Sequence, residues 1–254
     1  MVTQDNLRGG YRFISGIPAY SEGVVAMAGY EIVHITLHRP LAYRDGFGLI
    51  DRYLAAVDRP RQSLCGIQLR SPRPQSLAGF EAFNQDYHQL LVEWDLLVEG
   101  RTPIARTNVV PEVGTPEEPS LYAFAYTVES GTSDTAPSFI VAGAGETRGG
   151  SLSLDTVVRP GETSAEAMRD KAMCVMQTML ARLSGLGVAA AGVTVANVYT
   201  VREVQPYLED VILTGLGAAA VHGVHWYYTR PPITGIEFEM DVRGVRRELH
   251  LAAT

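Results

Sequence analysis

The chain has 254 residues, of which 46% are hydrophobic and 19% charged, and its formal net charge is −7. This composition is typical of a folded protein, and the length suffices for one large domain or for two units of about 125 residues each. Because nucleic-acid binding depends on concentrated positive charge, the acidic balance disfavours a nucleic-acid partner. No stretch reaches the roughly 18 apolar residues of a membrane span, and the first residues show no signal-peptide pattern, so we expect a cytoplasmic protein without a membrane partner.

Hydrophobic periodicity in the first half predicts a mixture of strands and helices. In chain order, the expected elements are a hairpin of strands over 20–37, a short helix over 46–57, a strand over 64–69, a helix over 77–94, and two closing strands over 105–110 and 121–128. The polar segment 129–137, which is rich in small residues and ends in proline, is the best candidate for a linker.

The second half predicts a similar order of elements. The expected elements are a strand over 139–143, a long helix that a capping box at 163–166 opens and that Gly185 and Gly187 end, a strand over 193–201, a helix over 206–216, and closing strands over 223–228 and 236–245. The repeated order predicts two tandem units, residues 1–130 and 137–254.

The last expected strand alternates between apolar and polar residues. Strand geometry would place one set on each face: Ile236, Phe238, Met240 and Val242 on the first, and Glu237, Glu239, Asp241 and Arg243 on the second. We expect the apolar face to be buried.

Four short segments match motifs of a known family. Residues 19–24 are similar to its Pro-Tyr-Ser-x-Ala-Val entry, and residues 80–87 to its Phe-x-x-x-Asn-x-x-Tyr helix. Residues 103–106 are similar to its Pro-x-Ala-Arg with one residue slipped, and residues 235–239 to its Leu-Val-Glu-Ile-Glu. Together they resemble the RidA (YjgF-like) family. The resemblance implies an α+β fold of two tandem RidA-like (chorismate-mutase-like) units, each a mixed β-sheet with helices packed on one face.

The two halves keep different members of the family's site. The first half has Arg106 at the place of the family's Arg, but Leu121 and Tyr122 stand where its Glu would fall. The second half has Glu237 at the place of the Glu, but His222 stands where the Arg would fall. Since neither half alone could rebuild the site, we expect Arg106 and Glu237 to meet through contact between halves, within one chain or across an interface.

The resemblance implies a role for each matching residue. Arg106 would hold a substrate carboxylate through two parallel hydrogen bonds, and Glu237 would position or deprotonate the attacking water. Tyr20 and Asn84 would line the site. The alternatives are ordinary ones: a surface arginine, a solvated glutamate, a tyrosine in the core and an asparagine on a helix surface.

The reaction that the resemblance implies is hydrolysis of an imine or enamine without a metal or any other cofactor. Among relatives of the family, deaminases of 2-aminomuconate and of its chlorinated analogue act on a dicarboxylate, whose second end His222 or Arg230 could hold. We therefore expect a 2-aminomuconate-type deaminase of aromatic-compound degradation, assembled as a homotrimer. The alternatives are a chorismatase-like enzyme acting on a cyclic dicarboxylate and a non-catalytic protein that binds small carboxylates.

Two further patterns do not indicate a site. His222 and His225 would point to opposite faces of the predicted strand, and His34 and His38 would lie roughly 13 Å apart, so no metal site is expected from either pair. Residues 143–151 look like a phosphate loop but lack the Gly-Lys-Ser/Thr ending, and we expect a flexible turn there.

Overall fold

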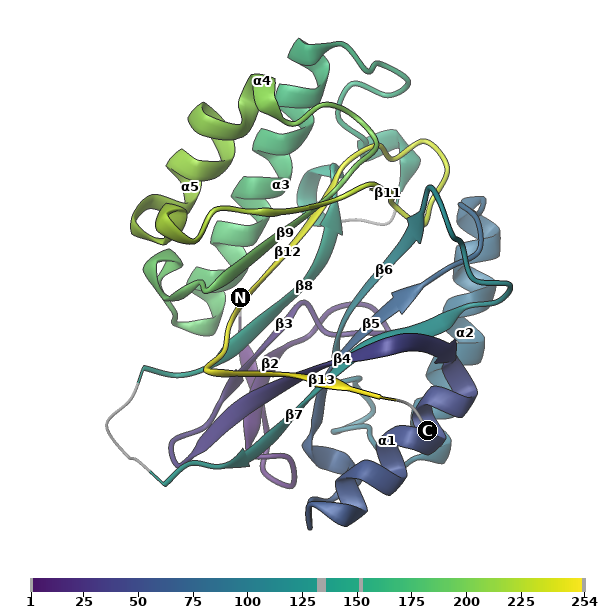
Figure 1. Cartoon of the computed structure of the whole chain (residues 1–254), viewed down its shortest axis with the longest axis vertical. Coiled ribbons are helices and arrows are strands. Elements are labelled where there is room, and N and C mark those ends of the chain that lie inside the picture. Colours follow the sequence, from purple (N-terminus) through teal and green to yellow (C-terminus); the bar gives the residue numbers. More distant parts are fainter. Residues whose placement is uncertain (1, 132–135, 151–152, 253–254) are drawn as a thin grey trace.

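The computed structural model describes residues 2–131, 136–150 and 153–252. Within these residues, two β-sheets pack against each other, and helices cover the outer face of each sheet (Figure 1). The α+β class predicted from the sequence is confirmed. No helix in the described ranges combines the length and the apolar character that crossing a membrane requires.

The smaller sheet comes mostly from the first half of the chain. Its elements and their helices are β4 (Tyr30–Ala42), α1 (Tyr43–Ala56), β5 (Leu64–Arg70), α2 (Leu77–Glu93), β6 (Ala105–Pro111) and β7 (Ser120–Glu129). Two short strands from the second half form its edges, β11 (Thr229–Arg230) and β13 (Arg247–Leu251).

The larger sheet combines the second half with the amino-terminal strands. In chain order it contains β1 (Thr3–Asn6), β2 (Tyr11–Ile14), β3 (Gly23–Ala26), β8 (Phe139–Gly145), β9 (Val195–Tyr199), β10 (His225–Tyr227) and β12 (Glu239–Gly244). Its outer face is covered by the long helix α3 (Ala165–Leu186) and by a helical segment made of α4 (Gln205–Tyr207), a π-helical turn (Leu208–Leu213) and α5 (Thr214–Leu216). Short 3₁₀ helices occur at Arg61–Ser63, Arg148–Gly150, Leu154–Thr156, Ala190–Gly192 and Gly217–His222.

The same four-strand topology occurs in both sheets. In the smaller sheet β5 pairs in parallel with β6 and antiparallel with β7, which pairs antiparallel with β4. In the larger sheet β9 pairs in parallel with β10 and antiparallel with β12, which pairs antiparallel with β8. This repetition agrees with two tandem units. That each unit is specifically RidA-like stays a prediction.

The sheets cross the predicted boundary between residues 1–130 and 137–254. The strands β1 to β3 belong to the larger sheet, while β11 and β13 belong to the smaller one. The two halves therefore exchange strands, and their division into two domains stays a prediction. In the predicted linker, residues 132–135 lie outside the described residues.

Three predicted elements differ from the structure. The hairpin expected over 20–37 is wrong, because β3 pairs with β2 and β8 whereas β4 pairs with β7 and β13 in the other sheet. The strand expected over 223–228 shortens to His225–Tyr227, and the last strand begins only at Glu239. Local alternation predicts an extended chain, but the partner of a strand depends on residues far away in the sequence.

The layer between the sheets contains a polar network beside an apolar cluster. The Asp241 carboxylate, on β12, accepts hydrogen bonds from Thr107 Oγ1 at 2.7 Å, Asn197 Nδ2 at 2.7 Å and the Tyr199 hydroxyl at 2.8 Å. Thr107 belongs to the smaller sheet and the other two donors to the larger one. Asp241 is only 3% exposed, so the polar face predicted for its strand is buried between the sheets.

Candidate active site

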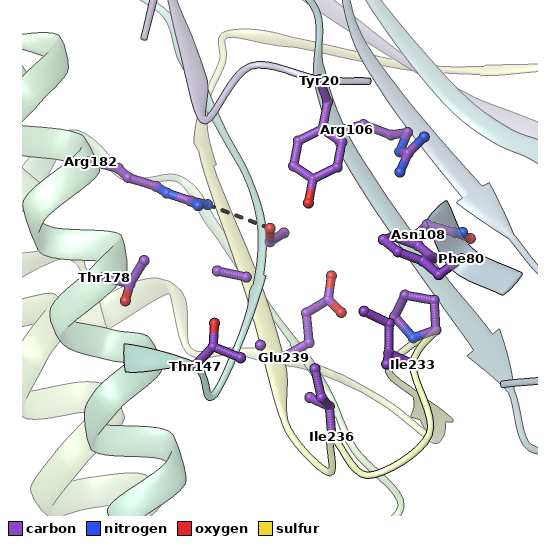
Figure 2. A pocket seen from close by; sticks show the side chains of 14 residues that line it. Tyr20, Phe80, Arg106, Asn108, Thr147, Thr178, Arg182, Ile233, Ile236 and Glu239 are labelled. Carbon is purple, nitrogen blue, oxygen red and sulfur yellow. Dashed lines mark hydrogen bonds between the residues drawn. The ribbon is translucent and has the colours of Figure 1, made fainter. Parts of the chain in front are cut away.

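A cavity opens where β6 of the smaller sheet meets β8 and β12 of the larger sheet (Figure 2). It encloses about 650 Å³, counting the part that is open to solvent. The segment before β3 links the two sheets here. Ser21 donates its backbone N–H to the Ile104 carbonyl at 2.9 Å, and the Glu22 carbonyl accepts the N–H of Ala142 at 3.0 Å. This link places Tyr20 over the cavity.

Arg106 lies in the cavity wall formed by β6 and is 3% exposed. Its Nη2 donates to Asn84 Oδ1, on α2, at 2.5 Å, and its guanidinium carbon lies 4.7 Å from the ring centres of both Tyr20 and Tyr87. Among the described residues, Arg106 Nη1 has no hydrogen-bond partner. Burial lowers the pKa of the guanidinium, but arginine stays charged in proteins. A buried cation with a free N–H favours an anionic ligand.

Arg182 approaches the cavity from α3 on the opposite side (Figure 2). Its Nη1 donates to the Ala142 carbonyl at 3.0 Å, and its Nη2 lies 3.5 Å from Glu22 Oε1. Its Nε has no hydrogen-bond partner in the part of the chain that is described. The cavity therefore has a second buried guanidinium with an unused N–H.

Glu239, the first residue of β12, lies between the two arginines and is 5% exposed. Removal from water raises the pKa of its carboxyl well above the usual value, and the negative charges of Asp241 and Glu146 raise it further. The positive charges of Arg106 and Arg182 lower this pKa, but burial outweighs them. Glu239 is thus a carboxyl that holds its proton more tightly than an exposed one.

Other residues complete the cavity with one more polar donor and an apolar wall. Asn108 Oδ1 accepts a hydrogen bond from Ser71 Oγ at 2.9 Å, while its Nδ2 has no partner within the described ranges. Phe80, Ile233 and Ile236 form the apolar wall. The Tyr20 hydroxyl points toward the carboxyl of Glu239 (Figure 2), and burial raises the pKa of this hydroxyl, which keeps it protonated.

The structure brings three of the predicted site residues together. Arg106 and Tyr20 line the cavity, and Asn84 lies behind Arg106 and orients it. The other three lie elsewhere. Glu237 precedes β12 and pairs with Arg202 at 3.0 Å, His222 is exposed at the end of a 3₁₀ helix, and Arg230 pairs with Glu112 at 2.6 Å.

Within one chain, Arg106 therefore shares the cavity with Glu239 and not with the predicted Glu237, while a meeting of Arg106 and Glu237 across an interface between chains stays a prediction. Both glutamates lie on the polar face of the alternating segment, but only the second lies within the strand that borders the cavity. Period-two alternation cannot distinguish residues two positions apart, because both point to the same face.

Arg182 and the glycines at the end of β8 were missed by the sequence reasoning. Arg182 falls on the apolar stripe of α3 that also contains Met179 and Leu186. A charged residue on such a stripe is buried with the apolar ones, and a buried charge often belongs to a functional site. Gly143 and Gly145 were expected in a flexible turn, but they belong to β8 and line the cavity. Of the same predicted turn, Ser151 lies outside the described residues.

A search for metal ligands in the described ranges finds no group of three or more His, Cys, Asp or Glu side chains placed to hold an ion. The chemistry that the cavity offers rests on two fixed cations and one protonatable carboxyl. The two cations can bind two anionic groups of a ligand, and the carboxyl can donate a proton to the ligand or accept one from it.

Gly143 leaves the space that the Glu239 carboxyl occupies. A Cβ atom at this position would overlap Glu239 Oε1 and would lie 3.0 Å from Thr107 Cγ2. We expect Gly143→Ala to lower the free energy of unfolding by about 1–3 kcal/mol, the usual cost of overpacking, as measured by urea denaturation. Gly48→Ala is the matched control, because its Cβ would meet only Arg52 Nη1 at 3.6 Å within helix α1 and should leave stability equal or higher. Equal stability of Gly143→Ala and wild type would contradict this packing.

Comparison with known proteins gives two findings on the family. The model of the family "2-aminomuconate deaminase CnbZ" matches residues 3–249. A 2-amino-5-chloromuconate deaminase from Comamonas testosteroni is 40% identical over 242 residues, which cover 94% of this chain and 95% of that protein. A crystal structure of a chorismatase is similar with a TM-score of 0.45 and 12% identity, covering 88% of this chain and 77% of that one, which is too distant to support an argument.

Neither finding on the family tests the resemblance to RidA proteins, which stays a prediction. The match over nearly the whole chain, together with the identity to a named deaminase, shows that this chain is an enzyme acting on C–N bonds and belongs to the 2-aminomuconate deaminase CnbZ family.

Proposed function

We propose that the enzyme hydrolyses a 2-aminomuconate-type dicarboxylate to the 2-oxo acid and ammonia, in the degradation of aromatic compounds. The observation that carries this proposal is the position of Glu239, a buried carboxyl, between the guanidinium groups of Arg106 and Arg182. The printed names of the family and of the Comamonas relative, both deaminases of amino-dicarboxylates, support the substrate class.

The two arginines would bind the two carboxylates of the substrate. Among the described residues, Arg106 Nη1 leaves two N–H groups and Arg182 Nε one N–H without a partner, and Asn108 Nδ2 is a further unused donor. A hydrogen bond to a charged group contributes about 1.5–3 kcal/mol, so two such clamps would fix the molecule at both ends. Arg182 thereby takes the place that the sequence suggested for His222 or Arg230.

The first chemical step converts the enamine into an iminium ion. Protonated Glu239 donates its proton to a carbon of the conjugated diene, and the electron pair of the amino group forms the C=N bond. The carboxylate left on Glu239 stabilises the positive charge that has formed. A raised pKa suits this role, because the acid must still hold its proton near neutral pH.

The second step hydrolyses the iminium ion. Water attacks the carbon of the C=N bond while the Glu239 carboxylate removes a proton from it, giving a carbinolamine and a protonated Glu239. The same carboxyl then protonates the nitrogen, the C–N bond breaks and ammonia leaves. Removal of the proton from the new oxygen restores protonated Glu239 and gives the 2-oxo acid. One water is consumed and one ammonia released, and no step requires a metal.

The remaining wall of the cavity suits the unsaturated chain of the substrate. Phe80, Ile233 and Ile236 present apolar surface between the charged ends. Apolar walls exclude water beyond the molecule that reacts and strengthen the electrostatic contacts inside.

Other parts of the sequence-based expectation stay predictions, namely the cytoplasmic location and the homotrimer. The non-catalytic alternative is wrong, because the family is one of enzymes. The chorismatase-like alternative stays a prediction.

The hydrolytic route predicts the origin of the new oxygen atom. With 2-aminomuconate in ¹⁸O-labelled water, wild-type enzyme should release ammonia and place the label on the 2-oxo carbon of the product, as measured by mass spectrometry after rapid reduction of the ketone. Reduction traps the label before it exchanges with solvent. No ammonia from 2-aminomuconate would defeat the proposed function.

Glu239→Gln keeps the shape of the side chain but removes the proton donor and base. We expect kcat to fall by about 10²–10⁴-fold, the usual contribution of general acid–base catalysis, with binding of unreactive muconate retained. Glu237→Gln is the matched comparison two residues away and should keep most of the activity, because Glu237 pairs with Arg202 outside the cavity. The reverse order of effects would return the catalytic role to Glu237.

The raised pKa of Glu239 also predicts how rate and stability depend on pH. Since the first step needs the proton, kcat/KM of the wild type should fall as pH rises through this raised pKa. The folded protein binds this proton more tightly than the unfolded chain, so Glu239 costs stability increasingly as pH rises above its unfolded-state value. Glu239→Gln should therefore unfold at a higher temperature than wild type at neutral pH, and a lower one would contradict the burial argument.

Arg106→Lys and Arg182→Lys test the two clamps. Each should lower kcat/KM by about a hundredfold, because an ammonium cannot replace the planar guanidinium and loses about 3 kcal/mol of charged hydrogen bonding. Arg230→Lys is the control, since Arg230 pairs with Glu112 away from the cavity. Wild-type kinetics in either cavity variant would remove that arginine from the binding site.

A further inference from the structure

A buried ion pair lies behind the cavity and has no part in the reaction steps described above. Lys171, the single lysine of the chain, and Glu146 both have fully buried side chains, and Nζ lies 3.0 Å from Glu146 Oε1. Lys171 Nζ also donates to the Val158 carbonyl at 2.8 Å. Moving two charges out of water is costly even when they pair, so this pair contributes little to stability by itself.

The Glu146 carboxylate also holds the backbone that leads into β12. Oε1 accepts the backbone N–H of Glu237 at 2.7 Å, and Oε2 accepts that of Phe238 at 3.0 Å. The next residue in the chain is Glu239. One carboxylate therefore accepts three hydrogen bonds, two of them from consecutive peptide groups directly before the proposed acid–base residue.

Glu146 is connected to the facing wall of the cavity as well. It follows Gly145 and precedes Thr147, and both of these neighbours line the cavity. Gly145 pairs with Glu239 in the register between β8 and β12. A shift of Glu146 would thus move both the wall at the end of β8 and the carboxyl that faces it.

We propose that Glu146, held by Lys171, is the positioning residue for Glu239. Its two backbone contacts set the point at which β12 begins and so direct Glu239, rather than Glu237, into the cavity. Its negative charge also favours the protonated form of Glu239. The inference rests on the proposed function, because it takes Glu239 to be the acid–base residue.

The charged groups around the carboxyl of Glu239 are consistent with a positioning role of Glu146. Besides Glu146, the groups that face Glu239 are Asp241 on the same strand, Arg106 on β6, Arg182 on α3 and the hydroxyl of Tyr20 before β3. Replacing Glu146 removes one negative charge near Glu239 and leaves the cavity contacts of both arginines in place.

Around Glu146 the neighbouring titratable groups are Lys171, Cys174 and Tyr207. Burial is the largest effect and raises the pKa of Glu146, and the N–H of Glu237 and the charge of Lys171 oppose this rise only in part. Lys171 therefore helps to keep Glu146 ionised, and the ion pair serves the site next to it.

Direct titration of Glu239 tests the inference without any need for turnover. The carboxyl carbon of ¹³C-labelled Glu239, assigned by its absence in Glu239→Gln, is followed by NMR against pH in full-length protein. In Glu146→Gln the titration midpoint of Glu239 should shift to lower pH. In Glu146→Asp, which keeps the charge but shortens the reach, the midpoint should stay near that of wild type.

Kinetics on 2-aminomuconate separate position from charge. Both Glu146 variants should lower kcat by about tenfold to a hundredfold, because a displacement of about 1 Å in a catalytic group costs this much, while KM should change little with both arginines intact. Glu248→Gln is the matched control. Glu248, on β13, pairs with Arg243 of β12, the strand that contains Glu239, but Glu248 does not line the cavity. The control variant should change neither the Glu239 midpoint nor kcat.

If Glu146→Gln does not fold, the double variant Glu146→Gln/Lys171→Met removes the unpaired lysine charge and carries the same expectations. An unchanged Glu239 midpoint together with an unchanged kcat in the folded variant would overturn the inference. If the wild type releases no ammonia from 2-aminomuconate, the proposed function is rejected, and a shifted midpoint would then support only the effect of the Glu146 charge on Glu239.

Discussion

Charges that are buried around the cavity must be compensated within the protein, and the cavity depends on this requirement. Each buried ion costs several kcal/mol unless hydrogen bonds and opposite charges replace water. Glu146 is compensated by Lys171 and two backbone N–H groups, whereas Arg106 and Arg182 keep unused donors within the described residues. Burial raises the pKa of Glu239, which makes its uncharged form easier to keep inside the protein. At the cavity, a substrate would complete the unused donors of Arg106 and Arg182.

The exchange of strands between the halves explains why one chain can build this site. The first half supplies Arg106 on β6, the second half supplies Arg182 and Glu239, and the segment that contains Tyr20 bridges the two sheets. The Asp241 network joins β6 to β9 and β12 in the same layer. A displacement of one sheet would therefore disturb the cavity and the polar network together, so fold and site are stabilised by the same contacts.

Much of the local structure follows from short-range signals in the sequence. Helix α3 begins after Ser164, one residue later than the capping box predicted at 163–166, and the Ser164 side chain accepts the N–H of Ala167 at 3.2 Å. The helix continues through Gly185 and ends at Gly187, which has the left-handed backbone that favours glycine. The repeated order of elements predicted the tandem arrangement, because hydrophobic periodicity depends on neighbours along the chain. Arg106 and Tyr20 were found through a motif in which residue type and spacing suffice.

The sequence by itself determined most of the elements, their repeated order and the Arg106 wall of the cavity, and the tertiary structure decided which charges meet there. Glu237 and Glu239 share one face in any alternating strand, so their pattern could not rank them. The choice depends on where β12 begins, and the contact that marks this point comes from Glu146, 91 residues away from Glu237 in the chain. Arg182 joins Arg106 only because α3 packs on the larger sheet and the two sheets pack face to face. Contacts between such distant segments have no period in the sequence, and only the folded chain reveals them.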